Sequence, residues 1–272
     1  MKIPAIKLAD RQAIPQIGLG LWQIKDQAQF NTAFETAIKA GYRHFDTAQI
    51  YENEQFLGEV WQASGLKREE LFITTKINIR NFGGHHLQKS FEESLQKLRS
   101  DYADLLLLHF PVTILRKKAW QELEKIQAAG SVKSIGVSNY TIRHLEEMRD
   151  YAKAMPAVNQ VELHVFLQQP ELVKYCQDHN IAVEAYSPLA HAKAMDNEAI
   201  AGIAKKHGKT YAQIMLRWCV EQGLIVLPKS VTPSRIKENI DIFDFQLDDE
   251  DLQAIAAQDR DMRTTWSPVH VP

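Results

Sequence analysis

The sequence has few cysteines and no long apolar run, and each absence excludes a class of protein. Its 272 residues include only Cys176 and Cys219, which lack the close spacing of a metal-binding or redox pair. We therefore expect two buried thiols in a reducing compartment. No apolar run approaches the roughly 18 residues that cross a bilayer, and residues 1–4 do not begin a signal-peptide core. The expectation is a cytoplasmic protein without a membrane partner.

An excess of charge of one sign is also lacking. Lys and Arg number 32 against 34 Asp and Glu, for a net charge of −2. This balance gives no electrostatic basis for binding nucleic acid. The chain has no Gly-x4-Gly-Lys-Ser/Thr phosphate loop, and segment 18–23 lacks the third glycine of the dinucleotide-binding turn. An open, doubly wound sheet is therefore the less favoured α/β architecture.

Segment 104–111, Asp-Leu-Leu-Leu-Leu-His-Phe-Pro, carries the first clear signal. Four consecutive leucines predict a strand that is buried on both faces. His109 follows them, and Pro111 stops the run. In a parallel barrel, catalytic groups lie at the C-terminal ends of the strands. The alternative for this segment alone is a core strand with a satisfied histidine at its edge.

Strands and helices alternate along the rest of the chain. A short hairpin is expected at residues 3–14, with a turn near Asp10, before the repeat begins. Eight strand–helix units in a chain of this length predict a single (β/α)8 TIM barrel domain spanning residues 1–272. Strands are expected at 16–22, 42–45, 71–75, 105–108, 132–137, 158–161, 181–186 and 224–227. Helices are expected at 28–40, 52–64, 86–98, 118–129, 141–152, 170–179, 198–207, 211–222, 234–240 and 249–257.

Four polar residues fall at or just beyond three successive strand ends: Asp46, Tyr51, Lys76 and His109. A tyrosine with an ordinary pKa near ~10 is a poor proton donor at neutral pH, and a neighbouring ammonium lowers that pKa. Lys76 is suited to supply the charge, Asp46 to hold Lys76, and His109 to orient a substrate oxygen. Together they predict an acid site for a carbonyl oxygen that gains negative charge. Taken singly, each has a structural alternative as a helix cap, an ion pair or a packed ring.

Residues 45–54 read Phe-Asp-Thr-Ala-Gln-Ile-Tyr-Glu-Asn-Glu and contain both Asp46 and Tyr51. This segment is similar to the signature of the aldo-keto reductases that holds the catalytic Asp and Tyr. The chain resembles that family along almost its whole length, and most closely the short bacterial 2,5-diketo-D-gluconate reductases. Further segments that carry the resemblance are 73–76, 104–111, 135–140, 159–162, 185–189 and 227–239. The resemblance implies a barrel that uses NADPH to reduce aldehydes and ketones, with Tyr51 as proton donor to the carbonyl oxygen.

The same resemblance assigns the cofactor residues. Ser138, Asn139 and Gln160 would hold the nicotinamide carboxamide, and Tyr186 would stack on the ring. The adenosine phosphate would lie on Lys229, Ser230, Arg235, Glu238 and Asn239, and further contacts would come from Gly20, Leu21, Trp22, Asp46, Ser187 and Leu189. Each group keeps an alternative: a helix cap for Ser138 and Asn139, a buried ring for Tyr186, and surface charges for Lys229 and Arg235.

The substrate wall departs from the family pattern. Asn78 and Phe110 stand where many relatives have tryptophan. We expect small aldehydes and α-dicarbonyls such as methylglyoxal as substrates, with 2,5-diketo-D-gluconate as a further candidate, and a monomeric protein. The expected pocket residues are Trp22, Tyr51, Asn78, His109, Phe110 and Trp266.

Two other functions compete with this one. A metal-dependent hydrolase on the same barrel would need paired histidines at the end of the first strand, where the chain reads Gly20-Leu21-Trp22. No metal is therefore expected. A non-catalytic barrel that binds NADPH as a redox sensor or partner subunit is the second alternative, and the complete acid site argues against it.

Overall fold

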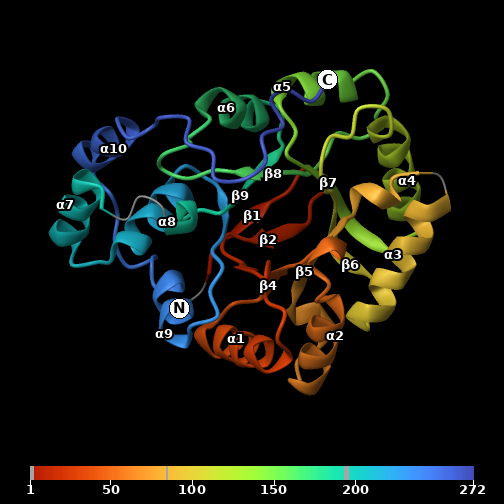
Figure 1. Cartoon of the computed structure of the whole chain (residues 1–272), viewed down its shortest axis with the longest axis horizontal. Helices are drawn as coiled ribbons and strands as arrows, with labels where there is room; N and C mark the ends of the chain where they lie inside the picture. Colours follow the sequence, from red (N-terminus) through yellow and green to blue (C-terminus); the bar gives the residue numbers. More distant parts are fainter. Residues whose placement is uncertain (1–2, 84, 193–195) are drawn as a thin grey trace.

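An eight-stranded parallel sheet lies at the centre of the molecule, and helices surround it (Figure 1). The computed structural model describes residues 3–83, 85–192 and 196–272. Neighbouring strands follow the chain order from β3 to β10. The strands are β3 (Leu19–Gly20), β4 (His44–Asp46), β5 (Phe72–Ile77), β6 (Ala103–Leu108), β7 (Val132–Ser138), β8 (Val158–Glu162), β9 (Ala182–Tyr186) and β10 (Ile225–Leu227).

The first and last strand segments meet and close the sheet into a barrel. Ile17 forms a parallel bridge with Val226, and the N–H of Gly18 donates to the Val226 carbonyl at 2.9 Å. The predicted (β/α)8 barrel is therefore confirmed. The regular part of the first strand is shorter than the predicted 16–22, because the residues before β3 reach β10 through a bridge and not through a continuous ladder.

Helices follow the strands and form a ring outside the barrel (Figure 1). Left-handed glycines end some of them, such as Gly41 with φ 107° after α1, as the sequence predicted. Helix α5 ends at Met148 and not at residue 152, because the next three backbone N–H groups bond three residues back in a tightened turn. The helices are α1 (Gln27–Ala40), α2 (Glu54–Ala63), α3 (His85–Leu98), α4 (Arg116–Ala128), α5 (Ile142–Met148), α6 (Pro170–Asp178), α7 (Glu198–His207), α8 (Tyr211–Glu221), α9 (Pro233–Ile240) and α10 (Asp249–Ala256).

The described part of the chain contains four short 3-10 helices that were not predicted, because three-residue turns leave no periodic signal. Three of them, η1, η3 and η4, follow β4, β5 and β9. Helix α2 starts at Glu54, two residues after the predicted start, because Glu52 has φ 59° and ends η1. The four are η1 (Gln49–Tyr51), η2 (Arg68–Glu70), η3 (Ile79–Asn81) and η4 (Ala190–Ala192).

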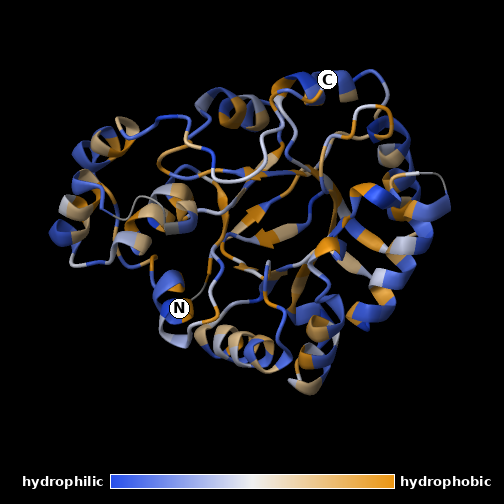
Figure 2. Cartoon of the chain, in the orientation of Figure 1, coloured by the Kyte–Doolittle hydropathy of each residue, from blue (hydrophilic) through white to orange (hydrophobic). Residues whose placement is uncertain are grey.

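Two apolar cores lie on the two faces of the barrel wall. Leu105 and Leu107 belong to the smaller cluster with Val158 and Ile225, whereas Leu106 and Leu108 belong to the larger cluster that includes helix residues. Alternate side chains of a strand point to opposite faces, so the leucine run fills both cores. Figure 2 shows apolar strands inside a ring of helices whose outer faces are hydrophilic.

The predicted N-terminal hairpin is present, and it covers one end of the barrel. Strands β1 (Ala5–Lys7) and β2 (Ala13–Pro15) pair antiparallel, and Leu8 and Ile14 join the smaller core cluster. Phe72, the first residue of β5, belongs to the same cluster, so the hairpin closes the N-terminal end. Across the described part of the chain, no helix has the length and apolar character needed to cross a membrane.

Candidate active site

The four predicted polar side chains meet at the C-terminal ends of β4, β5 and β6. Asp46 ends β4, Lys76 is the next-to-last residue of β5, and His109 directly follows β6. Tyr51 ends η1, in the loop after β4. Lys76 is 0% exposed and Asp46 4%, whereas Tyr51 and His109 are half-buried. Lys76 and Asp46 are thus buried in the barrel wall, whereas Tyr51 and His109 keep exposed surface that a substrate can contact.

Lys76 joins two of the other three. Its Nζ donates to Asp46 Oδ1 at 2.5 Å, to the Thr47 carbonyl at 3.2 Å and to Tyr51 Oη at 3.2 Å. These acceptors match the three N–H bonds of an ammonium. Because Tyr51 Oη accepts from Lys76, its own O–H proton is available for another partner.

The charges of this group follow from burial and from the ion pair. Burial lowers the pKa of Lys76, but Asp46 and Tyr51 outweigh it and raise that pKa above its ordinary value. Lys76 therefore stays charged at neutral pH. Burial raises the pKa of Tyr51, and Lys76 lowers it by a smaller amount. The predicted direction of the Lys76 effect is confirmed, but the predicted net lowering of the Tyr51 pKa is wrong, because desolvation of the phenol is the larger effect.

His109 is a neutral hydrogen-bonding group. Its ring meets the Tyr51 ring edge-on, with centroids 5.8 Å apart and planes at 78°. Burial, followed by the nearby Lys76 charge, lowers the pKa of His109 to about 3. A neutral imidazole at pH 7 carries one N–H donor and one acceptor nitrogen. This fits the predicted role of orienting a substrate oxygen.

The predicted carboxamide residues adjoin the acid site. Ser138 ends β7 beside Gln160 of β8, and Asn139, with φ 66°, donates from Nδ2 to Ser138 Oγ at 3.0 Å. Gln160 Nε2 donates to Asp46 Oδ2 at 2.8 Å. The helix-cap alternative fails for Ser138 and Asn139, because the N-cap of α5 is Thr141. Capping a helix is therefore not the role of Ser138 and Asn139.

Hydrogen bonds also hold the end of β9 in place. Tyr186 donates from its hydroxyl to Asn139 Oδ1 at 2.8 Å and lies 3.0 Å from Thr265 Oγ1. Tyr186 is thus a half-buried ring with a fixed hydroxyl. Ser187 follows with φ 49°, a left-handed conformation that non-glycine residues adopt uncommonly and that clusters at functional sites. Leu189 is half-buried and packs on the larger core cluster.

The end of the first strand reaches both parts of the predicted cofactor site. A Cβ atom at Gly20 would lie 3.6 Å from Lys229 Cβ, so the two segments are close. The N–H of Leu21 donates to the Asp46 carbonyl at 3.0 Å. Trp22 follows with 40% of its surface exposed. The structure therefore brings 20–22 between the catalytic group and the segment after β10.

The predicted phosphate residues surround the start of α9. Lys229 and Arg235 are exposed, Ser230 is buried, and Arg235 lies in the first turn of the helix. The N-cap residue Thr232 makes no side-chain hydrogen bond to the first turn. Two cations near uncapped backbone N–H groups fit an anionic phosphate. Although Lys229 is exposed, partial desolvation of its ammonium lowers its pKa.

The other two residues of this set are engaged within the protein or buried. Glu238 Oε1 accepts from Thr210 Oγ1, the N-cap residue of α8, at 2.8 Å. Asn239 is 2% exposed. The geometry therefore supports Lys229 and Arg235 more directly than Glu238 as phosphate ligands.

The predicted substrate residues form two ring pairs. Tyr51 meets His109, and Phe110 meets Trp266 edge-on with centroids 6.3 Å apart. Trp266 is 64% exposed and belongs to the segment after α10. An aromatic contact thus connects the loop after β6 to the tail of the chain, which the sequence had only suggested.

The side-chain oxygen of Asn78 is engaged within its own loop. Its Oδ1 accepts from the N–H of Arg80 at 3.1 Å and caps η3, while its own N–H donates to Gln49 Oε1 at 2.8 Å. The side-chain oxygen is thus used locally. The side-chain amide of Asn78 was expected to face a substrate. The cap uses its oxygen and not its nitrogen.

Sequence reasoning missed two buried carboxyl groups. Glu162, at the end of β8, accepts hydrogen bonds from the N–H and hydroxyl groups of both Thr264 and Thr265. Burial opposes the charge of Glu162, but hydrogen bonds from His164, Thr264 and Thr265 outweigh it and lower its pKa to about 2. Glu184, in the middle of β9, is 0% exposed. A charged residue in an otherwise apolar, doubly covered strand was the available signal.

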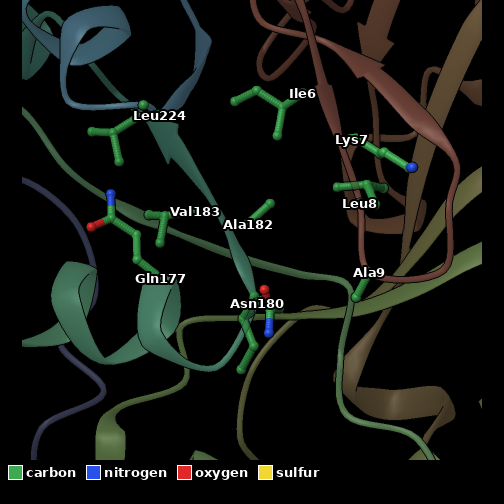
Figure 3. A pocket seen from close by; sticks show the side chains of 11 residues that line it. Ile6, Lys7, Leu8, Ala9, Gln177, Asn180, Ala182, Val183 and Leu224 are labelled. Atoms are coloured by element: carbon green, nitrogen blue, oxygen red, sulfur yellow. The ribbon is translucent and has the colours of Figure 1, made fainter.

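A cavity of about 500 Å³ lies at the opposite end of the barrel (Figure 3). The hairpin and the starts of β9 and β10 line it, and it touches none of the predicted site residues. Within residues 3–83, 85–192 and 196–272, no cluster of three His, Cys, Asp or Glu side chains has a geometry suited to a metal ion.

Comparisons with known proteins agree with this geometry. Residues 16–196 and 191–260 match the model of the Aldo/keto reductase family. Glyoxal reductase of Bacillus subtilis is 43% identical over 263 residues, covering 97% of this chain and 95% of the relative. Methylglyoxal reductase DkgA of Yersinia pestis is 45% identical over 260 residues, covering 94% and 93%. The crystal structure of the Bombyx mori aldo-keto reductase AKR2E5 with NADPH has a TM-score of 0.93 and 35% identity, and the match covers 97% of this chain and 90% of that one.

Proposed function

The chain belongs to the aldo/keto reductase family, and we propose that it reduces small aldehydes and α-dicarbonyls with Tyr51 as the proton donor. It is an NADPH-dependent oxidoreductase that converts carbonyl groups to alcohols. The observation that carries the residue assignment is the contact of one buried ammonium, Lys76, with both Asp46 and Tyr51.

The proposed roles follow from the charges of the site. NADPH, when bound, supplies the hydride for the carbonyl carbon. The carbonyl oxygen then gains negative charge, and Tyr51 donates its proton to it. Lys76 stabilises the phenolate that forms, and Asp46 holds Lys76 charged and in place. Neutral His109 donates a hydrogen bond to the same oxygen.

We assign the cofactor to the residues beside this group. Ser138, Asn139 and Gln160 supply polar groups for the carboxamide, and Tyr186 supplies an aromatic face. Lys229 and Arg235 supply cations for the adenosine 2′-phosphate, which distinguishes NADPH from NADH. The remaining predicted contacts, at 20–22, Ser187 and Leu189, belong to the same proposal.

The substrate class is proposed from the wall and from the relatives. Trp22, Phe110 and Trp266 offer exposed or half-exposed rings, which suit small carbonyl compounds with an apolar side. Two relatives bear the names glyoxal reductase and methylglyoxal reductase. We therefore place methylglyoxal and glyoxal first, with 2,5-diketo-D-gluconate as an additional substrate. We also propose that residues 1–272 form one domain, which acts as a monomer in the cytoplasm.

The direct test is turnover with a panel of carbonyl compounds. Purified protein is mixed with NADPH and with methylglyoxal, glyoxal, neutral aldehydes or 2,5-diketo-D-gluconate, and loss of NADPH absorbance is followed. We expect broad reduction of the small compounds and a large loss with Tyr51→Phe. NADPH binding without turnover of any aldehyde would favour the non-catalytic alternative, and turnover of one acidic keto-sugar alone would contradict the substrate assignment.

A further inference from the structure

A buried carboxyl group lies behind the proposed catalytic residues. Glu184 is in the middle of β9, and its side chain is 0% exposed. In the pairing of β8 with β9 it lies beside Gln160. Its Oε2 accepts from Gln160 Nε2 at 2.6 Å. Glu184 has no place in the function proposed above.

Gln160 connects this carboxyl group to the acid site. The same Nε2 donates to Asp46 Oδ2 at 2.8 Å, so two carboxyl groups take the two N–H bonds of one amide. Asp46 accepts from Lys76 through its other oxygen, and Lys76 donates to Tyr51. An unbroken chain of contacts therefore runs from Glu184 to the proposed proton donor.

This arrangement decides which way the Gln160 amide points. Its Oε1 is the atom that remains for a ligand, and it can only accept a hydrogen bond. A reversed amide would place that oxygen against the Asp46 carboxylate, which can only accept hydrogen bonds. We propose that Glu184 is a positioning residue, which holds Gln160 so that its oxygen receives an N–H of the cofactor carboxamide. The inference rests on the proposed function of Gln160 as a carboxamide ligand.

The titratable groups around Glu184 also make the site sensitive to pH. They are Asp46 and His44 of β4 and Lys76 of β5, and His44 Nε2 lies 3.6 Å from Glu184 Oε1. Burial and then Asp46 raise the pKa of Glu184 to about 8, while burial lowers the pKa of His44 to about 3. Both are thus neutral at pH 7. Above about pH 8, Glu184 becomes an added negative charge that raises the pKa of Tyr51 and weakens it as an acid.

Two substitutions separate the hydrogen bond from the charge. Glu184→Gln keeps an oxygen that accepts from Gln160 but cannot ionise, whereas Glu184→Leu removes the acceptor. We expect NADPH to bind Glu184→Gln within about twofold of wild type and Glu184→Leu about tenfold more weakly, because a buried N–H loses its partner. We expect kcat/KM of the wild type to decline as pH rises through about 8, and this decline should be absent in Glu184→Gln. Glu54→Gln is the matched control, because Glu54 is also buried but bonds to Thr75 and Ser94.

A double-mutant cycle tests whether Glu184 acts through Gln160. NADPH dissociation constants are measured by fluorescence titration without substrate for Glu184→Leu, Gln160→Ala and the double variant, and thermal unfolding reports folding. In the Gln160→Ala background, we expect Glu184→Leu to raise the NADPH dissociation constant by less than a further twofold. Equal losses in both backgrounds, or weakened binding by Glu184→Gln to the same degree as Glu184→Leu, would overturn the proposal. Absence of turnover by the wild type, together with the expected coupling between Glu184 and Gln160 in NADPH binding, would instead count against the proposed function.

Discussion

Lys76 donates a hydrogen bond to the hydroxyl oxygen of Tyr51 across 3.2 Å. This contact makes the phenol an acceptor toward the protein interior and a donor toward the outside. It also places the charge that can stabilise a phenolate next to the oxygen that would carry it. The predictions below concern this pair and the groups around it.

Tyr51→Phe keeps the ring but removes the proposed proton donor. General acid catalysis typically contributes about 10²–10⁴-fold, so kcat for methylglyoxal should fall at least by the lower factor. NADPH affinity should stay within about twofold, because the ring contact with His109 is retained. Steady-state kinetics and a cofactor titration give both values. Near-wild-type turnover would show that Tyr51 is not the acid.

Lys76→Met and Asp46→Asn should differ in severity. The first removes the ammonium that faces Tyr51 and leaves Asp46 as a buried carboxylate without its closest partner. The second keeps the ammonium, and asparagine still offers an oxygen to it. We expect kcat to fall much further in Lys76→Met, together with a lower melting temperature. Equal kcat values in the two variants would contradict the role of the lysine charge.

Arg235→Ala should separate the two nicotinamide cofactors. Loss of one charged contact to the adenosine 2′-phosphate costs on the order of 1.5–3 kcal/mol, or roughly tenfold or more in NADPH affinity. NADH lacks that phosphate and should bind almost as before. Lys237→Ala is the matched control, because Lys237 is an exposed cation on the same helix outside the proposed set. Equal weakening of NADPH and NADH would make Arg235 a structural residue.

Asn78→Trp should narrow the substrate entrance, but it also removes the cap of η3. Asn78→Ala removes only the cap, and the difference between the variants reports the bulk of the ring. We expect Asn78→Trp to raise KM for bulky aldehydes more than KM for methylglyoxal. Asn78→Ala should change the two KM values by the same factor. A uniform effect of Asn78→Trp on all substrates would place the residue outside the pocket.

Glu162 should hold the tail that carries Trp266. Glu162→Ala removes the acceptor for the N–H and hydroxyl groups of Thr264 and Thr265, so trypsin should cleave after Arg263 severalfold faster. Glu171→Ala, at an exposed position of α6, is the control. Unchanged cleavage in Glu162→Ala would mean that other contacts hold the tail.

The same carboxyl group predicts a pH effect on stability. Its pKa is about 2 in the folded protein and near ~4.3 in an unfolded chain. A lowered carboxyl pKa contributes stability that is complete above the unfolded value and is lost as pH falls through the folded value. Wild type should therefore lose more stability than Glu162→Gln between about pH 4.3 and pH 2, as measured by denaturant unfolding.

The sequence by itself determined the barrel and the positions of Asp46, Tyr51, Lys76 and His109. Strand periodicity, glycine helix ends and the step from an apolar run to a polar residue are local properties. In a parallel barrel the strand ends meet on one face, so a residue's place along its own strand predicts its neighbours. This is why residues up to 63 positions apart, from 46 to 109, could be grouped before any contact was known.

The tertiary structure alone decided how those groups interact with the rest of the protein. The contacts of Glu184 with Gln160 and of Glu162 with Thr264 join segments whose relative height and side-chain direction no local pattern encodes. The net pKa of Tyr51 depends on how completely its hydroxyl is removed from water, which is a property of the packed barrel. Periodicity is local, whereas desolvation and long-range hydrogen bonds exist only after the strands have closed around the site.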